Sequence, residues 1–265
     1  MAVLETKALT RKFKNFTAVD QLSLSIEPGE VFGLLGPNGA GKTTTIKMLT
    51  TLLPLTSGHA TVAGFDIVTQ QAQVRRSIGY VPQLLSADGT LTGYENLLIF
   101  AKLFDIPPAE RDRRVREALN FMNLDEFADK LVRNYSGGMI RRLEIAQSML
   151  HRPKVLFLDE PTVGLDPTAR NLVWEHLEQL RSEYGTTIFL TTHMMEEADA
   201  ICTRVAIMHL GKVAAIGSPA ELKASIGKAH ATLDDVFIYY SGNVIDTGGN
   251  FREISRTRRT ARRLG

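Results

Sequence analysis

The chain combines short, continuously apolar runs with longer segments whose apolar residues recur at helical spacing. Continuous apolar runs are typical of strands that are buried on both faces of a parallel sheet. Three runs fit this description, at residues 31–35, 155–158 and 187–190. Helical spacing follows the first run, at Ile46, Leu49 and Leu53, and appears again between the second run and the third. The alternation of strand and helix predicts an α/β fold with a parallel sheet.

Other segments predict further strands and turns. Residues 22–26 alternate between apolar and polar types, which indicates a half-buried strand, and the helix that contains Ile46 and Leu49 is predicted to end near Pro54, with residues 56–58 as a breaker. Two more strands are predicted at residues 60–64 and 77–82. Two apolar segments flank a glycine-containing turn within residues 205–216, which predicts a hairpin.

The middle of the chain has a different character. From about residue 86 to residue 150 the apolar residues follow a helical period, as in Leu97, Ala101 and Phe104, so a helical subdomain is predicted there. Residues 219–225 predict a short helix. Residues 233–240 show no clear pattern, and no element is predicted for them.

Composition narrows the class of protein. Of the 265 residues, 44% are hydrophobic and 23% are charged, which is close to the globular average and predicts a packed core. The single cysteine, Cys202, excludes an internal disulfide and suits a reducing compartment. The first residues lack the apolar segment of a signal peptide, and no run reaches the roughly 18 apolar residues of a membrane helix. We therefore expect a soluble chain that reaches membranes only through partners.

Charge is unevenly distributed along the chain. The net charge is +2, but residues 252–265 hold six arginines and one acid, Glu253. The remaining body has 25 basic and 28 acidic residues, which argues against a protein that binds duplex nucleic acid. The basic tail fits either contact with anionic lipid or RNA, or an unstructured, solvated end.

One glycine-rich segment, which we call the phosphate loop (residues 36–44), carries the main chemical signal. It matches the P-loop pattern Gly-x4-Gly-Lys-Thr and lies between a predicted strand and a predicted helix. Its glycines allow successive N–H groups to point at a phosphate chain, and the helix dipole adds positive potential. Lys42 supplies a charge for the β- and γ-phosphates, and the Thr43 hydroxyl is a candidate ligand for Mg²⁺. Its residues are Gly36, Pro37, Asn38, Gly39, Ala40, Gly41, Lys42, Thr43 and Thr44.

Two acidic residues end a strand that is predicted to run parallel to the strand before the phosphate loop. Ligands of open parallel sheets lie beyond the carboxyl ends of the strands, which places Asp159 beside Thr43. A carboxylate at this position can hold Mg²⁺. Glu160 points elsewhere and is a candidate for orienting or deprotonating the attacking water.

A second anion-binding turn is predicted at Ser136, Gly137 and Gly138, which we call the serine–glycine turn (residues 136–138). A hydroxyl and bare backbone amides at a helix start suit a phosphate. The alternative is a simple helix cap.

The ordered set of motifs resembles the ATP-binding cassette family over about residues 4–217. It consists of the phosphate loop, Gln83, the serine–glycine turn, Asp159-Glu160, Gly164-Leu165-Asp166-Pro167 and Thr191-Thr192-His193. The resemblance implies a P-loop NTPase (RecA-like) core of the α/β class, with an antiparallel β subdomain and a helical signature subdomain. It also implies an ATPase domain at residues 1–217, with the helical subdomain inserted at about 86–150, and a C-terminal extension at residues 218–265.

The resemblance also implies roles for individual residues. Glu160, His193 and Gln83 would act in catalysis, and Thr43, Gln83 and Asp159 would hold Mg²⁺. ATP would contact the phosphate loop and, from a second copy, Ser136, Gly137, Gly138 and Asp166. Phe13 would stack on adenine, with Phe16 as the alternative. The turn departs from the common Leu-Ser-Gly-Gly-Gln, because Tyr135 and Met139 replace the leucine and the glutamine.

The resemblance implies a head-to-tail dimer of identical chains that binds ATP and Mg²⁺ and drives integral membrane permease subunits from the cytoplasmic face of the membrane. No nucleic-acid partner is expected. The segments Tyr-Ser-Gly-Gly-Met and Leu-Asp-Asp-Val-Phe are similar to those of cassettes of the daunorubicin-exporter type. This similarity favours export of a drug-like or lipid substrate. The alternatives are an importer subunit, a soluble cassette protein of translation or DNA repair, and a non-hydrolysing regulator. Glu160 and His193 count against the last of these.

Overall fold

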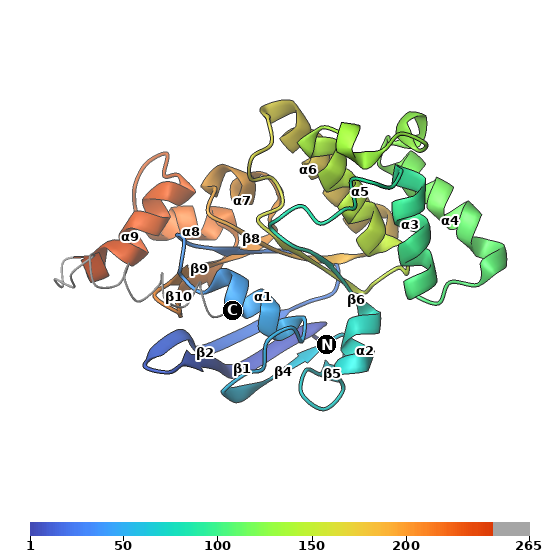
Figure 1. Ribbon diagram of the computed structural model, residues 1–265. Coiled ribbons are helices and arrows are strands. Elements are labelled where there is room, and N and C mark those ends of the chain that lie inside the picture. The colour runs from blue at the N-terminus through green and yellow to red at the C-terminus, as the bar shows by residue number, and fades with distance from the viewer. Residues whose placement is uncertain (246–265) are drawn as a thin grey trace.

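The computed structural model describes residues 1–245, which form two sheets and the helices around them (Figure 1). The arginine tail, and the prediction made for it, lie outside the described residues. One sheet is antiparallel and has the strand order β2-β1-β4-β5. Its strands are β1 (Leu4–Phe13), β2 (Phe16–Ile26), β4 (Ser57–Val62) and β5 (Phe65–Asp66).

The other sheet has six strands in the order β10-β9-β3-β8-β7-β6. All neighbours in it are parallel except β9 and β10, which form the predicted hairpin. The carboxyl ends of the parallel strands therefore meet at one edge, where an open parallel sheet places its ligand. The strands are β3 (Val31–Leu35), β6 (Ile78–Val81), β7 (Val155–Asp159), β8 (Thr187–Thr192), β9 (Arg204–His209) and β10 (Lys212–Gly217).

Helices cover both faces of the six-stranded sheet. In Figure 1, α1 lies between the two sheets, and α5 and α6 lie on the opposite face. None of the helices described over residues 1–245 is both long and apolar enough to cross a membrane. The helices are α1 (Lys42–Leu49), α2 (Gln71–Ser77), α3 (Gly93–Leu103), α4 (Pro108–Phe121), α5 (Gly137–Met149), α6 (Pro167–Tyr184), α7 (Met195–Ile201), α8 (Pro219–Ser225) and α9 (Leu233–Ile245), with short 3-10 turns at Asp125–Phe127 and Val132–Asn134.

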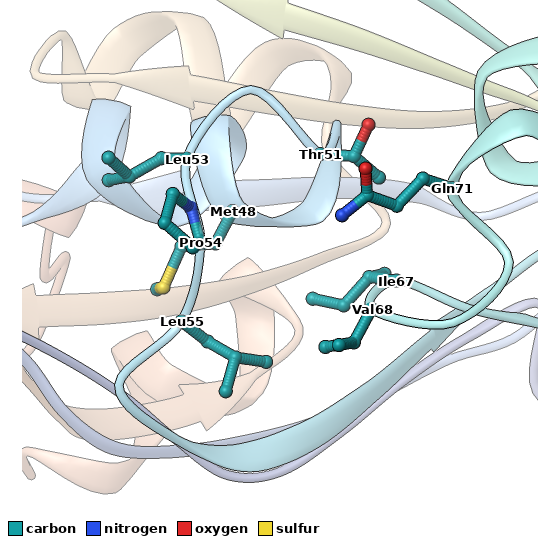
Figure 2. Close-up of a pocket in the computed structure, with 8 residues that line it drawn as sticks. All are labelled: Met48, Thr51, Leu53, Pro54, Leu55, Ile67, Val68 and Gln71. Atoms are coloured by element: carbon teal, nitrogen blue, oxygen red, sulfur yellow. The ribbon is translucent and has the colours of Figure 1, made fainter.

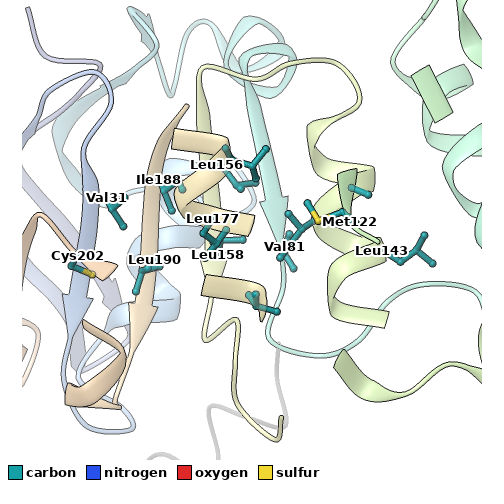
Figure 3. Close-up of a cluster of buried hydrophobic side chains, with 14 of the residues drawn as sticks. Val31, Val81, Met122, Leu143, Leu156, Leu158, Leu177, Ile188, Leu190 and Cys202 are labelled. Carbon is teal, nitrogen blue, oxygen red and sulfur yellow. The ribbon is translucent and has the colours of Figure 1, made fainter. Parts of the chain in front are cut away.

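The apolar runs are continuous because each strand packs against a different core on each face. Phe32 and Leu34 of β3 join the core between the two sheets, while Val31 and Leu35 join the core under α5 and α6. Figure 3 shows part of the second core, where strand side chains meet Leu143 of α5 and Leu177 of α6. The predicted fold class, a P-loop NTPase core with an antiparallel β part and a helical part, is confirmed.

Several strands and one helix differ from the elements predicted from the sequence. β1 was not predicted, and β2 begins six residues before the predicted strand at residue 22. Helix α1 ends at Leu49, before the predicted helix breaker at residues 56–58, and within that breaker Ser57 and Gly58 begin β4, where Ser57 pairs with Thr10. Residues 233–245 form α9, which is anchored to the core by the buried Leu233 and Val236.

Candidate functional site

The phosphate loop joins β3 to α1 at the carboxyl edge of the six-stranded sheet. Gly36, Gly39 and Gly41 all have positive φ angles, which a residue with a side chain adopts only with strain. A Cβ on Gly41 would lie 2.4 Å from the carbonyl oxygen of Ala18, and one on Gly36 would lie 2.3 Å from that of Met208. Neighbouring backbone thus packs too closely around the loop for any residue other than glycine at these two positions.

The loop presents a row of backbone donors. Among residues 1–245, no hydrogen bond uses the backbone N–H groups of six of its residues, and such groups at a helix start suit a phosphate. The six are Asn38, Gly39, Gly41, Lys42, Thr43 and Thr44. Lys42 Nζ donates to the carbonyl oxygen of Gly36 at 2.6 Å and to that of Pro37 at 3.3 Å. The lysine charge therefore lies within the curl of the loop.

Thr43 and Asp159 meet across the sheet edge. Thr43 Oγ1 donates to Asp159 Oδ1 at 3.1 Å, and Thr191 Oγ1 donates to the same oxygen at 2.6 Å. Asp159 ends β7, and Thr191 lies on the adjacent strand β8. Two hydroxyl groups and a buried carboxylate are hard oxygen donors of the kind that Mg²⁺ prefers, so the residues present fit that ion. Thr191 as a partner of Asp159 was not predicted from the sequence, although it lies in the predicted Thr191-Thr192-His193 motif.

Glu160 is the centre of a polar cluster. Its Oε1 lies 3.3 Å from Lys42 Nζ and 3.2 Å from His193 Nδ1, and its Oε2 accepts a 2.9 Å hydrogen bond from Gln83 Nε2. Glu160 has φ +52°, a left-handed conformation that is uncommon for a residue with a side chain. The strained backbone turns the chain sharply at the end of β7, which lets two successive carboxylates serve different partners.

The electrostatics of the cluster follow from burial. Lys42 and Glu160 are almost fully buried, whereas Gln83 and His193 are exposed. Burial lowers the pKa of the Lys42 ammonium, and the carboxylates of Glu160 and Asp159 oppose that shift. Burial, together with the charge of Asp159, raises the pKa of the nearby Tyr80 phenol to about 12, so it stays protonated. The arrangement can bind a polyphosphate at the loop and hold a water beside a carboxylate.

The serine–glycine turn lies apart from this cluster. Ser136 caps α5, because its Oγ accepts a hydrogen bond from the N–H of Met139 at 3.2 Å. A Cβ on Gly138 would lie 2.7 Å from the Cβ of Ala169, so the turn packs against the start of α6. No hydrogen bond or ion pair within the described part of the chain joins Ser136, Gly137 or Gly138 to the phosphate loop. Ser136 is exposed, and the one hydrogen bond given to its hydroxyl comes from its own helix.

The remaining predicted residues also lie outside the cluster. Asp166 is exposed and caps α6 through a 2.9 Å hydrogen bond from the N–H of Ala169. Phe13 and Phe16 face each other across the turn between β1 and β2, with 37% and 38% of their surfaces exposed. The guanidinium of Arg11 lies 4.5 Å from the centre of the Phe13 ring.

One buried acid near the site was missed by the sequence analysis. Glu197 of α7 is fully buried and accepts hydrogen bonds from Thr162 at 2.7 Å and from the indole of Trp174 at 3.3 Å. It ties the segment after Glu160 to the helix after His193. A glutamate in the first turn of a short helix resembles an ordinary exposed acid, so the sequence offered no signal for it.

A separate cavity of about 100 Å³ lies between α1 and α2, beyond the carboxyl end of α1 (Figure 2). Its walls are mostly apolar and carry no charged group, so it does not suit a phosphate. It is lined by Met48, Thr51, Leu53, Pro54, Leu55, Ile67, Val68 and Gln71.

Comparison with known proteins places the chain among transporter subunits. Residues 19–163 match the family described as ABC transporter. The chain is 45% identical to the daunorubicin/doxorubicin resistance ATP-binding protein DrrA of Streptomyces peucetius, over 84% of this chain and 68% of that protein. It is 40% identical to the linearmycin resistance ATP-binding protein LnrL of Bacillus subtilis, over 85% of this chain and 72% of that protein.

Solved structures agree with the sequence comparison. An ATP-binding subunit of an ABC transporter superposes with a TM-score of 0.80 at 28% identity, over 90% of this chain and 99% of that chain. An ATP-binding cassette, solved as a dimer in a post-hydrolysis state with ADP and phosphate, superposes with a TM-score of 0.72 at 27% identity, over 81% of this chain and 98% of that chain.

Proposed function

The chain belongs to the ABC transporter family, and we propose that it is the ATP-hydrolysing subunit of an exporter whose membrane-spanning subunits are separate chains. The observation that carries this proposal is the meeting of Lys42, Thr43, Asp159 and Glu160 at one edge of the parallel sheet. That set joins a phosphate cradle, an oxygen site for a metal and a candidate base within a few ångströms.

ATP binding follows from the phosphate loop. Its unused N–H groups and the Lys42 ammonium would hold the β- and γ-phosphates, and the start of α1 adds its dipole. Thr43 and Asp159, together with Gln83, would hold Mg²⁺, which would neutralise the charge that develops on the phosphates. We expect Phe13 to stack on the adenine, with Phe16 as the alternative.

Hydrolysis is assigned to the Glu160 cluster. A carboxylate held by Gln83 and His193 can orient a water and accept its proton as the water attacks the γ-phosphate. His193, which is exposed, would then be available to bond the γ-phosphate. Burial of Glu160 next to Lys42 restrains the position of the carboxylate.

We propose that the site is completed by a second copy of the chain in a head-to-tail dimer. Ser136 and Gly138 of one chain would contact the γ-phosphate held by the phosphate loop of the other, with Asp166 at the seam. The exposure of Ser136 supports this arrangement, as does the dimeric cassette among the similar structures. ATP would join the two chains, and hydrolysis would let them separate, which is a two-state motion that can drive a membrane partner.

Export is favoured over import by the resistance functions named for DrrA and LnrL. A drug-like or lipid molecule is the proposed substrate class, and the chain would act at the cytoplasmic face of the membrane. We assign residues 1–217 to the ATPase domain, with the helical subdomain at about 86–150, and residues 218–265 to a C-terminal extension. The same two comparisons favour a transporter subunit over the soluble alternative, a protein of translation or DNA repair.

The test is to purify the tagged chain from membranes of cells that express it, to identify the membrane protein that accompanies it, and to reconstitute both in liposomes. The proposal predicts Mg²⁺-dependent ATP hydrolysis that rises when a drug-like or lipid substrate is added. An active chain that never associates with a membrane protein would favour the soluble alternative.

A further inference from the structure

The ring of Phe13 has a cation over one of its faces. The guanidinium of Arg11 lies 4.5 Å from the centre of that ring. The two residues are two apart on β1, so their side chains lie on the same face of the strand. Among residues 1–245, no lysine or arginine lies in this way over Phe16, the ring paired with Phe13 across the turn. The cation therefore distinguishes two phenylalanines whose exposure is nearly equal.

Arg11 is itself held by the segment that follows α1. Its Nη1 donates to the carbonyl oxygen of Pro54 at 2.8 Å. That segment is tied back to the helix, because the N–H of Leu53 donates to the carbonyl oxygen of Lys47 at 2.9 Å. Since α1 begins at the phosphate loop, a short set of contacts connects the Phe13 ring to the helix whose first turn carries phosphate donors.

The hairpin that carries Phe13 lies against the phosphate loop. β2 passes so close to the loop that a Cβ on Gly41 would lie 2.4 Å from the carbonyl oxygen of Ala18. Ala18 is two residues beyond Phe16, at the end of the hairpin where Phe13 and Phe16 pair. A nucleotide whose phosphates occupy the loop therefore has an aromatic ring close by. With Arg11 over one face of that ring, the other face is the one on which a base can stack.

Packing alone explains the position of Arg11 less well. Its Nε atom is enclosed, and it donates to no acceptor within the described part of the chain. An enclosed donor without a partner is unfavourable, and a long flexible side chain can avoid that cost by turning into solvent. A cation over an aromatic ring is attracted by the negative potential of the ring face, which offsets the missing hydrogen bond. The contact with Phe13 is thus what the side chain gains in this position.

We propose that Arg11 is a positioning residue for the adenine of ATP: it holds the Phe13 ring from one side so that the base stacks on the other. The inference rests on the proposed function, in which a phenylalanine stacks on adenine, and it assigns that role to Phe13 rather than to Phe16. A ring that is already held loses less conformational freedom when the base binds, so Arg11 raises the affinity for ATP. Within residues 1–245, the hydrogen bonds and ion pairs of Arg11 do not include the phosphate loop, so its effect is confined to the base.

The test compares Arg11→Met with Lys12→Met in the full chain. Methionine is unbranched and flexible, and it removes one positive charge in each variant. Lys12 is a matched control, because it is exposed and is the next residue of β1, and successive side chains of a strand point to opposite faces. Titration calorimetry in the presence of Mg²⁺ measures the Kd of each variant for ATP and for inorganic triphosphate, which has no base.

For Arg11→Met, the proposal predicts a Kd for ATP about 3-fold to 5-fold higher, the size expected when a cation–π contact at an exposed site is lost. The Kd for inorganic triphosphate should not change. Lys12→Met should match the wild type with both probes. The proposal would be overturned by wild-type affinity for ATP in Arg11→Met, by an equal loss of affinity for the two probes, or by equal effects of the two substitutions.

A second measurement separates the ring contact from a general effect on the hairpin. In a chain that already carries Phe13→Ala, Arg11→Met should leave the Kd for ATP unchanged, because there is no ring left to hold. In a chain that carries Phe16→Ala, it should keep its full effect of about 3-fold to 5-fold. An effect of Arg11→Met that persists without the Phe13 ring would refute the positioning role.

If Arg11→Met fails to fold, Arg11→Lys takes its place, because an ammonium group lacks the plane with which a guanidinium lies over the ring while it donates to Pro54. This variant should also weaken the binding of ATP and spare that of inorganic triphosphate, and wild-type affinity for ATP would overturn the proposal. Failure of the proposed function itself would look different, because the wild-type chain would then show neither ATP binding nor Mg²⁺-dependent hydrolysis.

Discussion

The ammonium group of Lys42 and the carboxylate of Glu160 form a buried ion pair, with Nζ 3.3 Å from Oε1. Lys42 comes from the loop after β3 and Glu160 from the end of β7, and β8 lies between the two strands. The phosphate cradle and the candidate base are therefore held in direct electrostatic contact. A change to either residue should affect binding and hydrolysis in different ways.

Replacing Lys42 by alanine should weaken ATP binding by about 10-fold to 100-fold, because a hydrogen bond to a charged group contributes about 1.5–3 kcal/mol. Titration calorimetry of ATP binding measures the change. Glu160→Gln is the control, since it removes charge from the same ion pair but leaves the phosphate donors in place. Unchanged affinity in Lys42→Ala would contradict the role given to the phosphate loop.

Replacing Glu160 by glutamine should lower the rate of hydrolysis by about 10²- to 10⁴-fold, the usual contribution of a general base. The shape and most hydrogen-bonding capacity of the side chain are kept, so ATP should still bind. The chain should then accumulate as an ATP-bound dimer on size-exclusion chromatography. Adding Lys42→Ala to this variant should abolish the dimer, whereas rapid turnover in Glu160→Gln alone would remove Glu160 from the role of base.

Phe13 and Phe16 offer a matched comparison, because they are paired across one turn and are almost equally exposed. Phe13→Ala should weaken ATP binding by about 10-fold, since stacking of a base on an aromatic ring contributes about 1–3 kcal/mol. Phe16→Ala should have less than about a twofold effect by the same reasoning. Fluorescence titration with a nucleotide analogue measures both, and the reverse order would assign adenine stacking to Phe16.

The start of α9 predicts a pH dependence. Lys228, together with the hydroxyl and N–H of Thr232, holds the pKa of Asp235 at about 2, below its ordinary value of 3.8. A depressed carboxyl pKa contributes stability that is present above the unfolded value and is lost as pH falls through the folded value. The difference in unfolding temperature between wild type and Asp235→Asn should therefore be greatest above pH 4 and should shrink toward pH 2. A difference that is independent of pH would contradict this account.

The strands around the site could be predicted from the sequence because both of their faces are buried. Phe32 and Val31 face different cores, so β3 is apolar throughout, and the apolar residues of β7 and β8 divide between the same two cores. β1 was not predicted because the alternation of apolar and polar residues along it is interrupted. Ala8 has φ +48°, and the pairing of β1 with β2 shifts register between Thr6 and Leu9, which breaks the period of two that marks a strand in sequence.

Some features of the site could likewise be predicted from the sequence, and others could not. The adjacency of Thr43 and Asp159 was predictable, because parallel strands bring their carboxyl ends to one edge. The burial of Glu197 was not, since charged residues on a helix are usually exposed and only tertiary packing shows that this one is enclosed.

The central claim is that each ATP is held by the phosphate loop of one chain and the serine–glycine turn of another. The most direct measurement is the rate of ATP hydrolysis per chain as a function of chain concentration, with the oligomeric state followed by sedimentation velocity in the presence of ATP. The claim predicts that the rate per chain falls in parallel with the dimer as the chain is diluted. A constant rate per chain in dilute samples that contain only monomer would contradict it.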